Sequence, residues 1–258
     1  MNPGRTRNLP FDDGLQVLAP RGLKADRGHS YISLEKEAVA LRRMFKIDLD
    51  RPIDGVALWN AIPYRLVSRV AGCAYHVDVD IRPLGNGRIG QACWDSAIGK
   101  FLISLTEDSY RRLELGQVWD LIHEIMHVRL HPRLLQRLKS SEYLEKAYNE
   151  RFLKHSHRSS RDTEWQANAG AAAVIMPAIG ICKLEQRVRH DELLLRLEKS
   201  FSVRPVIAQR RWEIYLKYKS DLLTVSAEVQ LSKKLPESIH SSPWANWAEL
   251  SSKRGSQR

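Results

Sequence analysis

Apolar side chains recur at helical spacing near the start of the chain. Behind the polar residue Ser33, which can cap a helix, four apolar residues follow at intervals of three or four: Leu34, Ala38, Leu41 and Phe45. This spacing predicts an amphipathic helix over residues 33–45, and the acidic residues of its first turn suit the helix dipole. A second, shorter helix is expected from its cap at Asp54 to Ile62.

The pattern then changes to that of β-strands. Short runs rich in β-branched and aromatic residues are separated by turn signals, and they lie at residues 64–67, 76–81, 89–94 and 101–105. These runs predict a small, mainly antiparallel sheet. The last two runs are expected to form a hairpin through residues 96–99.

From residue 106 the spacing is again helical almost to the end. A short helix capped by Thr106 or Asp108 comes first. The next apolar face is formed by Val118, Leu121, Ile122, Ile125 and Val128. It predicts a helix that Pro132 ends. Three further helices are expected over the ranges 164–176, 185–200 and 206–218.

The order of these elements predicts an α+β fold with a helical addition. Residues 1–30 mix Pro, Gly, Arg and Asp without apolar periodicity, and they are expected to form a flexible basic tail. The α+β domain is expected over 31–182, followed by a helical, helix-turn-helix-like subdomain over 183–231. The Ser-rich residues 232–258 predict a second flexible tail.

Two histidines and a glutamate stand on the helix that precedes Pro132. Residues four apart on an α-helix lie on one face, about 6 Å apart along the axis. His123 and His127 can therefore direct their imidazoles at one metal ion, with Glu124 beside them, as in the HExxH motif of zinc peptidases. On so apolar a helix, these polar groups would destabilise the fold by several kcal/mol unless a cation satisfied them.

A catalytic zinc ion has three protein ligands and keeps its fourth position for water, so a third ligand is required. Leu130 and Arg133 stand where the metzincin motif HExxHxxGxxH needs Gly and His, and this excludes that class. His131 lies four residues beyond His127, but a third consecutive ligand on a straight helix moves away from the ion.

Other candidates for the third ligand lie further along the chain. His155 and His157 fall in a stretch, residues 129–161, that has nine basic and three acidic side chains, and we expect them to be solvated. Glu164 is the better candidate, because it opens a helix whose interior is apolar. Asn168, one turn later, could accept the remaining ring N–H of one histidine and fix its tautomer.

Composition and charge add broad limits. Among 258 residues, 41 are basic and 30 acidic, and the net charge of +11 favours acidic partners such as nucleic acid or an acidic protein surface. The three cysteines contain no CxxC pair, so neither a disulfide framework nor a thiolate zinc site is expected. No apolar run of about 18 residues and no secretory signal is present, so a cytoplasmic protein without membrane contact is expected.

A basic segment near the end favours a different function. In LEKSFSVRPVIAQRRWEIYLKYK, the residues Arg204, Arg210 and Arg211 accompany helical periodicity, and such a helix can contact DNA phosphates. The simpler interpretation is a helical subdomain packed under the metal site, with the arginines on its solvated face. No Cys/His finger, RNA-binding aromatic signature or clear recognition helix adds to the DNA interpretation.

The metal motif and the later helix together resemble a known family. HEIMHVRLHP and EWQANAGAAAVIMP are similar to the paired motifs of the ImmA/IrrE zinc metallopeptidases, in which an HExxH helix is followed by ExxANxFAxxLLMP. The resemblance implies a zincin-like metallopeptidase domain. It also implies that His123, His127 and Glu164 bind Zn2+ and that Glu124 is the general base.

The same resemblance implies an intracellular, gluzincin-type endopeptidase. Its substrate would be a cognate helix-turn-helix transcriptional repressor in stress response or mobile-element regulation. The alternative is a zinc-containing DNA-binding regulatory protein without proteolytic activity. The oxyanion donor stays open among Tyr143, Tyr148, His155 and His157, and the oligomeric state stays open too.

The chain departs from the family pattern at three places. Met126 stands where the family usually has Gly, and it adds bulk beside the metal helix. Gly170 stands where the family usually has Phe, which removes a core aromatic ring. The basic stretch between His127 and Glu164 is also long, and it is expected to influence which substrates the enzyme accepts.

Overall fold

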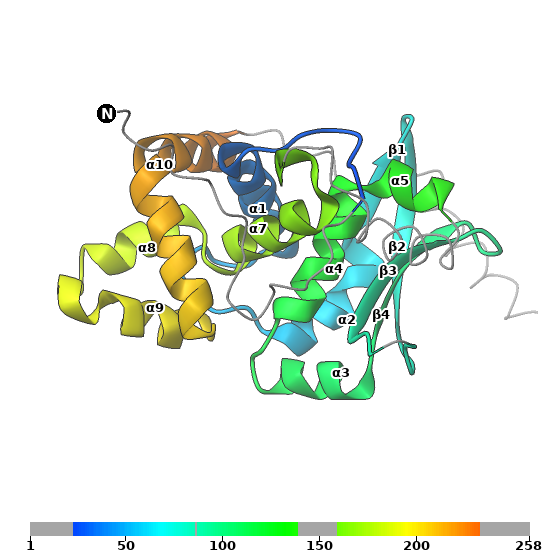
Figure 1. The fold of residues 1–258 in the computed structure, drawn as a ribbon, viewed down its shortest axis with the longest axis horizontal. Helices are drawn as coiled ribbons and strands as arrows, with labels where there is room; N and C mark the ends of the chain where they lie inside the picture. Colours follow the sequence, from blue (N-terminus) through cyan, green and yellow to red (C-terminus); the bar gives the residue numbers. More distant parts are fainter. Residues whose placement is uncertain (1–22, 86, 139–158, 233–258) are drawn as a thin grey trace, which may run out of the picture.

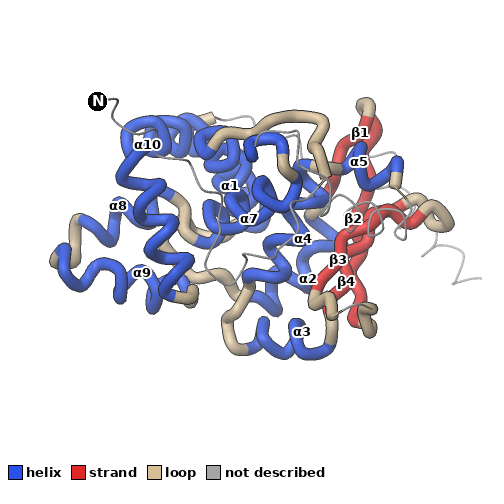
Figure 2. The backbone as a smooth tube through the Cα atoms, in the orientation of Figure 1, coloured by secondary structure: helices blue, strands red, loops and turns tan. Residues whose placement is uncertain are grey.

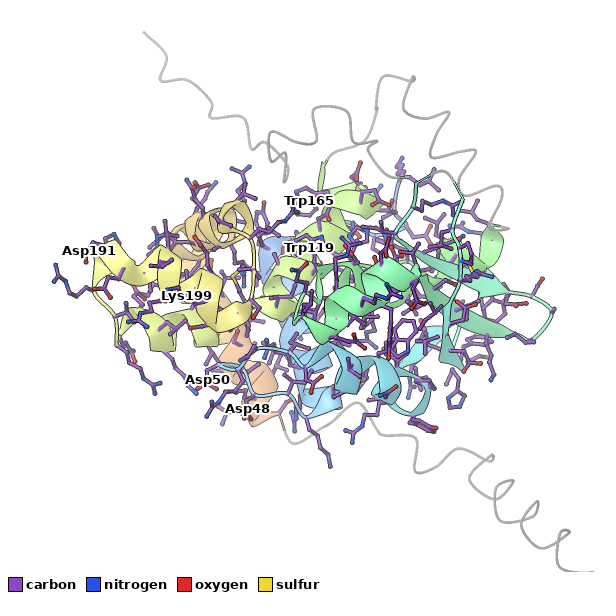
Figure 3. All side chains as sticks on the ribbon, turned by 90° about the horizontal axis from the view of Figure 1, so that it is seen from below. Asp48, Asp50, Trp119, Trp165, Asp191 and Lys199 are labelled. Carbon is purple, nitrogen blue, oxygen red and sulfur yellow. The ribbon has the colours of Figure 1, made fainter. Side chains whose placement is uncertain are left out.

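The computed structural model describes residues 23–85, 87–138 and 159–232. The molecule is elongated, with a small β-sheet at one end and the helices of the C-terminal part at the other (Figures 1 and 3). Between them lie the helices α1 (Tyr31–Phe45), α4 (Trp119–Leu130) and α7 (Thr163–Ile175), and the fold is α+β as predicted. Figure 3 labels Trp119 and Trp165 in this middle part, whereas Asp191 and Lys199 lie toward the helical end.

The first two helices begin close to their predicted caps. α1 (Tyr31–Phe45) is capped by Ser30 rather than Ser33, and the two serine side chains each accept from the other residue's backbone N–H. α2 (Gly55–Arg65) is capped by Asp54, as predicted. The predicted end at Ile62 was wrong: Pro63 lies inside the helix, where it removes one i→i−4 hydrogen bond, and the backbone nevertheless continues helical to Arg65.

The sheet has four strands, shown in red in Figure 2: β1 (Val67–Val70), β2 (Cys73–Ile81), β3 (Gly90–Asp95) and β4 (Lys100–Leu105). Their order is β1-β2-β4-β3. The pairs β1–β2 and β3–β4 are antiparallel hairpins, the second of them as predicted, but the central pair β2–β4 is parallel. The sheet is thus mainly antiparallel, as predicted, but it contains one parallel pair, because the chain crosses from β2 to the far edge and returns through the hairpin.

One central helix packs against this sheet and against a second central helix. α4 (Trp119–Leu130) carries the HExxH residues and contacts β3, β4 and α7 (Thr163–Ile175). The other described elements are α3 (Glu107–Glu114), α5 (Pro132–Arg137), the short 3-10 helices η1 (Ser159–Arg161) and η2 (His190–Glu192), α8 (Ala178–Glu185), α9 (Leu193–Phe201) and α10 (Pro205–Leu231). Thr106, not Asp108, caps α3.

The C-terminal helices differ from the prediction in their bounds, and they share a hydrophobic core with the rest of the domain. The predicted helix over 185–200 is replaced by the end of α8, the turn η2 and α9, because residues 186–192 are rich in charge and lack an apolar face. α10 runs well beyond 218 and is kinked at Tyr218. The predicted boundary at residue 182 falls inside α8, and the main core is continuous from α1 to α10, so residues 183–231 share the core of the domain.

One of the three arginines in the DNA-binding interpretation is buried. The Arg211 side chain is 1% exposed, donates to the Met176 carbonyl oxygen at 2.9 Å and pairs with Glu35, which is also buried. Arg210 forms an ion pair with Glu213 at 3.3 Å. Arg211 therefore holds α10 against α1 and cannot serve a phosphate.

Residues 23–29, here named the N-terminal strap, are packed on the body of the molecule. The backbones of Lys24 and Asp162 form an isolated antiparallel β-bridge. The strap also exchanges backbone hydrogen bonds with residues 160–163 at 2.7 to 3.0 Å. Leu23 and Ala25 are buried. The predicted flexible tail over 1–30 was thus too long. Residues 23–29 are held mainly through backbone hydrogen bonds, which produce no periodic pattern of apolar residues in the sequence.

Several predictions fall outside the described residues. These are the tail over 1–22, most of the basic stretch after residue 138, and the tail after 232. Among the described helices, none by itself is long and apolar enough to cross a membrane, and only the bent pair α7 and α8 taken together reaches that length and composition.

Candidate metal centre

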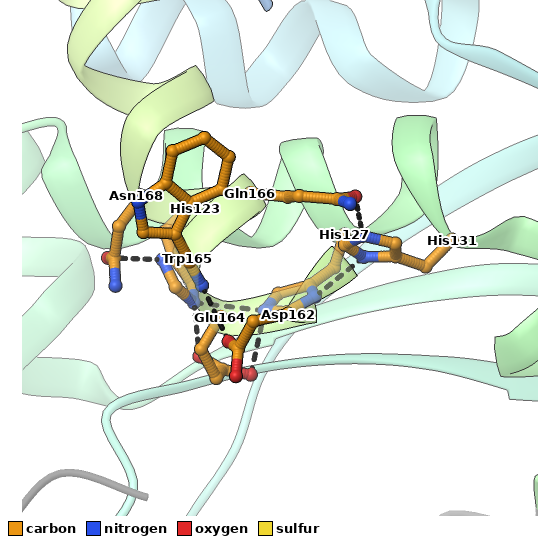
Figure 4. A network of polar contacts seen from close by, with 8 residues as sticks. All are labelled: His123, His127, His131, Asp162, Glu164, Trp165, Gln166 and Asn168. Atoms are coloured by element: carbon orange, nitrogen blue, oxygen red, sulfur yellow. Dashed lines mark hydrogen bonds and ion pairs between the residues drawn. The ribbon is translucent and has the colours of Figure 1, made fainter. Parts of the chain in front are cut away.

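The structure brings three of the predicted site residues together between α4 and α7 (Figure 4). His123 Nε2 lies 3.2 Å from Glu164 Oε2, and His127 Nε2 lies 3.3 Å from Glu164 Oε1. The two Nε2 atoms are 3.0 Å apart. One potential ligand atom from each of the three residues lies within 4.8 Å of the other two, so one cation could contact all three side chains.

The local sequence explains how each side chain reaches this point. His123 and His127 share one face of α4 because they are one helical turn apart. Asp162 caps α7 by accepting from the Trp165 backbone N–H at 2.9 Å, which fixes Glu164 in the first turn of the helix. The cluster therefore depends on the distance between the two helices.

Met126 on α4 and Gly170 on α7 meet where the two helices are in contact. A Cβ atom added to Gly170 on α7 would collide with the end of the Met126 side chain on α4 and lie 3.3 Å from its Cγ. Met126 is 1% exposed and fills the space over Gly170. The two residues noted above as departures from the expected family pattern therefore touch each other, with a large side chain on α4 facing a glycine on α7.

The outer nitrogen of each histidine has a polar partner. His123 Nδ1 lies 3.0 Å from Asn168 Oδ1, the partner predicted for one of the histidines. His127 Nδ1 lies 3.2 Å from His131 Nδ1, which is buried beside it. His131 is therefore outside the ligand group, and sequence reasoning missed its role, although its spacing of four from His127 was a usable signal.

Charge interactions set the protonation of the cluster. Burial by itself lowers the pKa of His123, but the Glu164 carboxylate, with smaller help from Glu124 and Asn168, raises it to about 9. Burial by itself raises the pKa of Glu164, but His127 and His123 outweigh it and hold that pKa well below its usual value. The cluster thus strongly favours a positive charge between its members.

Glu124 lies on the same helix next to the cluster. Its side chain is 9% exposed, and burial raises its pKa, although His123 and His127 act in the opposite direction. Gly90 at the start of β3 makes room for it, because a Cβ atom there would lie 3.0 Å from Glu124 Oε1. Sequence reasoning missed Gly90, since the contact joins a strand to a helix far away in the chain.

The donor set fits a zinc ion. Two imidazole nitrogens and a carboxylate on two helices are a common protein ligand set of catalytic zinc. Both imidazoles turn Nε2 inward while Nδ1 is engaged by another residue, which is how zinc-binding histidines are usually held. The four oxyanion candidates Tyr143, Tyr148, His155 and His157 lie outside the described residues.

A comparison with protein families supports this interpretation. Residues 109–213 match the family model of the IrrE N-terminal-like domain, Peptidase_M78. The match includes α4 and α7, and with them the whole cluster and Glu124. It confirms the predicted resemblance and the zincin-like type of fold. No curated protein matches the chain.

Proposed function

We propose that this chain, which carries a peptidase domain of the ImmA/IrrE family, is a zinc-dependent endopeptidase of the gluzincin type. The observation that supports the proposal best is the meeting of two imidazoles and a carboxylate from separate helices, with Glu124 beside them. His123, His127 and Glu164 would hold the ion. Asn168 would hold the His123 ring in place through its oxygen atom.

Glu124 has the properties of a general base for peptide hydrolysis. When bound, a zinc ion supplies Lewis acidity, which polarises the peptide carbonyl and makes a water molecule acidic near neutral pH. The Glu124 carboxylate would accept the proton of the attacking water and pass it to the leaving amine nitrogen. Its raised pKa suits both steps, because a very acidic carboxylate would be a poor base.

Strand β3 offers a place for an extended substrate. Within the described residues, β3 is hydrogen-bonded to β4 on one side only, and it forms one end of the strand order. Its first residue, Gly90, lies against Glu124. A peptide that added to this edge as a strand would pass beside the general base, with its backbone held by strand pairing.

The substrate that we propose is a helix-turn-helix transcriptional repressor that controls stress-response or mobile-element genes. The resemblance of the paired motifs to ImmA/IrrE enzymes supports this choice, and the net charge of +11 is compatible with an acidic partner surface. A repressor substrate would place the reaction in the cytoplasm. Cleavage would release the repressed genes.

Metal content tests the first part of the proposal. We expect about one zinc per wild-type chain by elemental analysis, and clearly less in His127→Ala and Glu164→Ala, because a site with two remaining ligands binds zinc weakly. His190→Ala changes an exposed histidine away from the site and should retain the metal. Wild-type protein that stays folded and takes up no added zinc would refute the proposal.

Proteolysis tests the second part. Zinc-loaded wild type and Glu124→Gln would each be incubated with the soluble proteins of the source cell, and new N-termini would be compared by mass spectrometry. We expect termini that depend on Glu124 within a DNA-binding repressor, while Glu124→Gln keeps its zinc. No Glu124-dependent terminus in any protein would count against peptidase activity. Cleavage confined to proteins without DNA-binding domains would count against the repressor.

A further inference from the structure

On the side of the His127 ring that faces away from Glu164, Nδ1 contacts a chain of buried polar groups that the proposed mechanism does not use (Figure 4). His131 lies next to His127, and its other nitrogen, Nε2, lies 2.8 Å from Gln166 Oε1. Gln166 Nε2 donates to the carbonyl oxygens of Arg27 and Ser160, at 2.8 and 2.7 Å. His131 is 4% exposed and Gln166 is fully buried, so solvent scarcely competes for these bonds.

The direction of each hydrogen bond follows from the two carbonyl groups. A carbonyl oxygen can only accept, so both N–H bonds of the Gln166 amide are committed to Arg27 and Ser160. The amide oxygen then faces His131, and because it also only accepts, His131 Nε2 must carry a hydrogen. In a neutral imidazole the second nitrogen is bare, and His131 Nδ1 accepts the hydrogen of His127 Nδ1.

The last bond in this chain decides which atom of His127 is free. With its hydrogen on Nδ1, the His127 ring has a lone pair on Nε2, the nitrogen that faces Glu164. A second hydrogen on His131 would point at His127 Nδ1 and force the His127 hydrogen onto Nε2, where it would block a metal. The orientation of the Gln166 amide thus determines, through the hydrogen bonds of His131 and His127, which nitrogen of His127 carries the hydrogen.

We propose that His131 and Gln166 are positioning residues that keep His127 in its metal-binding tautomer. The inference rests on the proposed function, since it needs His127 to be a ligand. It also links the N-terminal strap to the site, because Arg27 belongs to the strap and Ser160 to η1. His123 lacks such a chain among the described contacts and is held by the Asn168 amide.

Zinc affinity separates this role from simple packing. Competition with a chromophoric chelator would give the zinc dissociation constants of the wild type, His131→Leu and His131→Asn, with His190→Leu as the control. We expect His131→Leu to weaken zinc binding about 10- to 100-fold, as loss of a partner of a metal-bound histidine usually does. The Asn oxygen can accept from His127 Nδ1, so His131→Asn should recover most of the affinity.

Nitrogen-15 chemical shifts of the imidazoles in the metal-free wild type report the tautomers directly. We expect the His131 hydrogen on Nε2 and a His127 hydrogen on Nδ1. A neutral His131 with its hydrogen on Nδ1 would overturn the proposal, and so would a folded His131→Leu variant with wild-type zinc affinity. Wild-type protein without zinc affinity would instead overturn the proposed function, while the tautomers would still show whether the hydrogen-bond chain exists.

Discussion

The contact between Met126 and Gly170 makes a quantitative prediction about how α4 and α7 pack. Replacing Gly170 with Ala adds a methyl group that meets the end of Met126, with Cγ and Sδ also at 3.3 and 3.4 Å. Overpacking of a buried contact costs about 1–3 kcal/mol. Ala is favoured over Gly inside a helix by about 1 kcal/mol, which partly offsets that cost. We therefore expect Gly170→Ala to change the free energy of unfolding by about 0–2 kcal/mol, toward lower stability.

The sign should reverse once the methionine is shortened. Met126→Ala alone leaves a cavity and is expected to destabilise the protein by about 2–5 kcal/mol. In that background the methyl group of Gly170→Ala meets open space, and it should stabilise the protein by about 1 kcal/mol through helix propensity. The two substitutions are thus expected to couple by about 1–3 kcal/mol.

Urea unfolding followed by far-UV circular dichroism would measure all four proteins of this cycle. Gly85→Ala is the control, because nothing lies within 4 Å of a Cβ atom there, and it should shift stability by less than about 1 kcal/mol. Coupling below about 0.5 kcal/mol would mean that the two sites are independent. The contact between Met126 and Gly170 would then not set the distance between the metal-binding helices.

Three further predictions concern charge and the general base. Arg211→Met should lower stability by about 3–5 kcal/mol in urea unfolding, because it leaves Glu35 charged and buried; a smaller loss in the double variant Arg211→Met with Glu35→Leu would support this cause, and an equal loss would contradict it. Metal-free protein should lose stability as pH rises from about 6.5 through about 9, because the His123 ring, whose pKa is raised to about 9, stabilises the fold only while it is protonated. Urea unfolding at the two pH values would measure this loss, and the His123→Ala variant should not show it. Gly90→Ala should slow Glu124-dependent cleavage about tenfold with unchanged zinc content, because the new methyl group presses on the base; an unchanged cleavage rate would show that the base has room to move.

The ligand group could be predicted from the sequence because its geometry is local. The spacing of His123 and His127 fixes them on one helical face whatever surrounds the helix. Glu164 was recognisable as an acidic residue at the start of an apolar helix. In both places the argument needed only the regular shape of an α-helix, whereas the pairing of the two helices rested on the need for a third zinc ligand and on the resemblance of the paired motifs.

Features that join distant parts of the chain could not be predicted in the same way. The parallel pairing of β2 with β4 depends on where the chain crosses the sheet, and strand periodicity does not encode this. The N-terminal strap is held by backbone groups, which every sequence has. The hydrogen bond from Gln166 to the Arg27 carbonyl oxygen could not be predicted either, because the sequence does not show which backbone carbonyl group a buried glutamine will contact.

The N-terminal strap lies outside the range that matches the family model, so that range and the folding unit have different limits. A fragment of residues 109–213 would contain His123, Glu124, His127 and Glu164. It would lack α1, the sheet and the carbonyl group of Arg27 that orients Gln166. Such a fragment would expose the face of α4 that packs on the sheet and the face of α7 that packs on α1. If the proposed function holds, the smallest piece expected to bind zinc therefore begins at the strap, about 100 residues before His123.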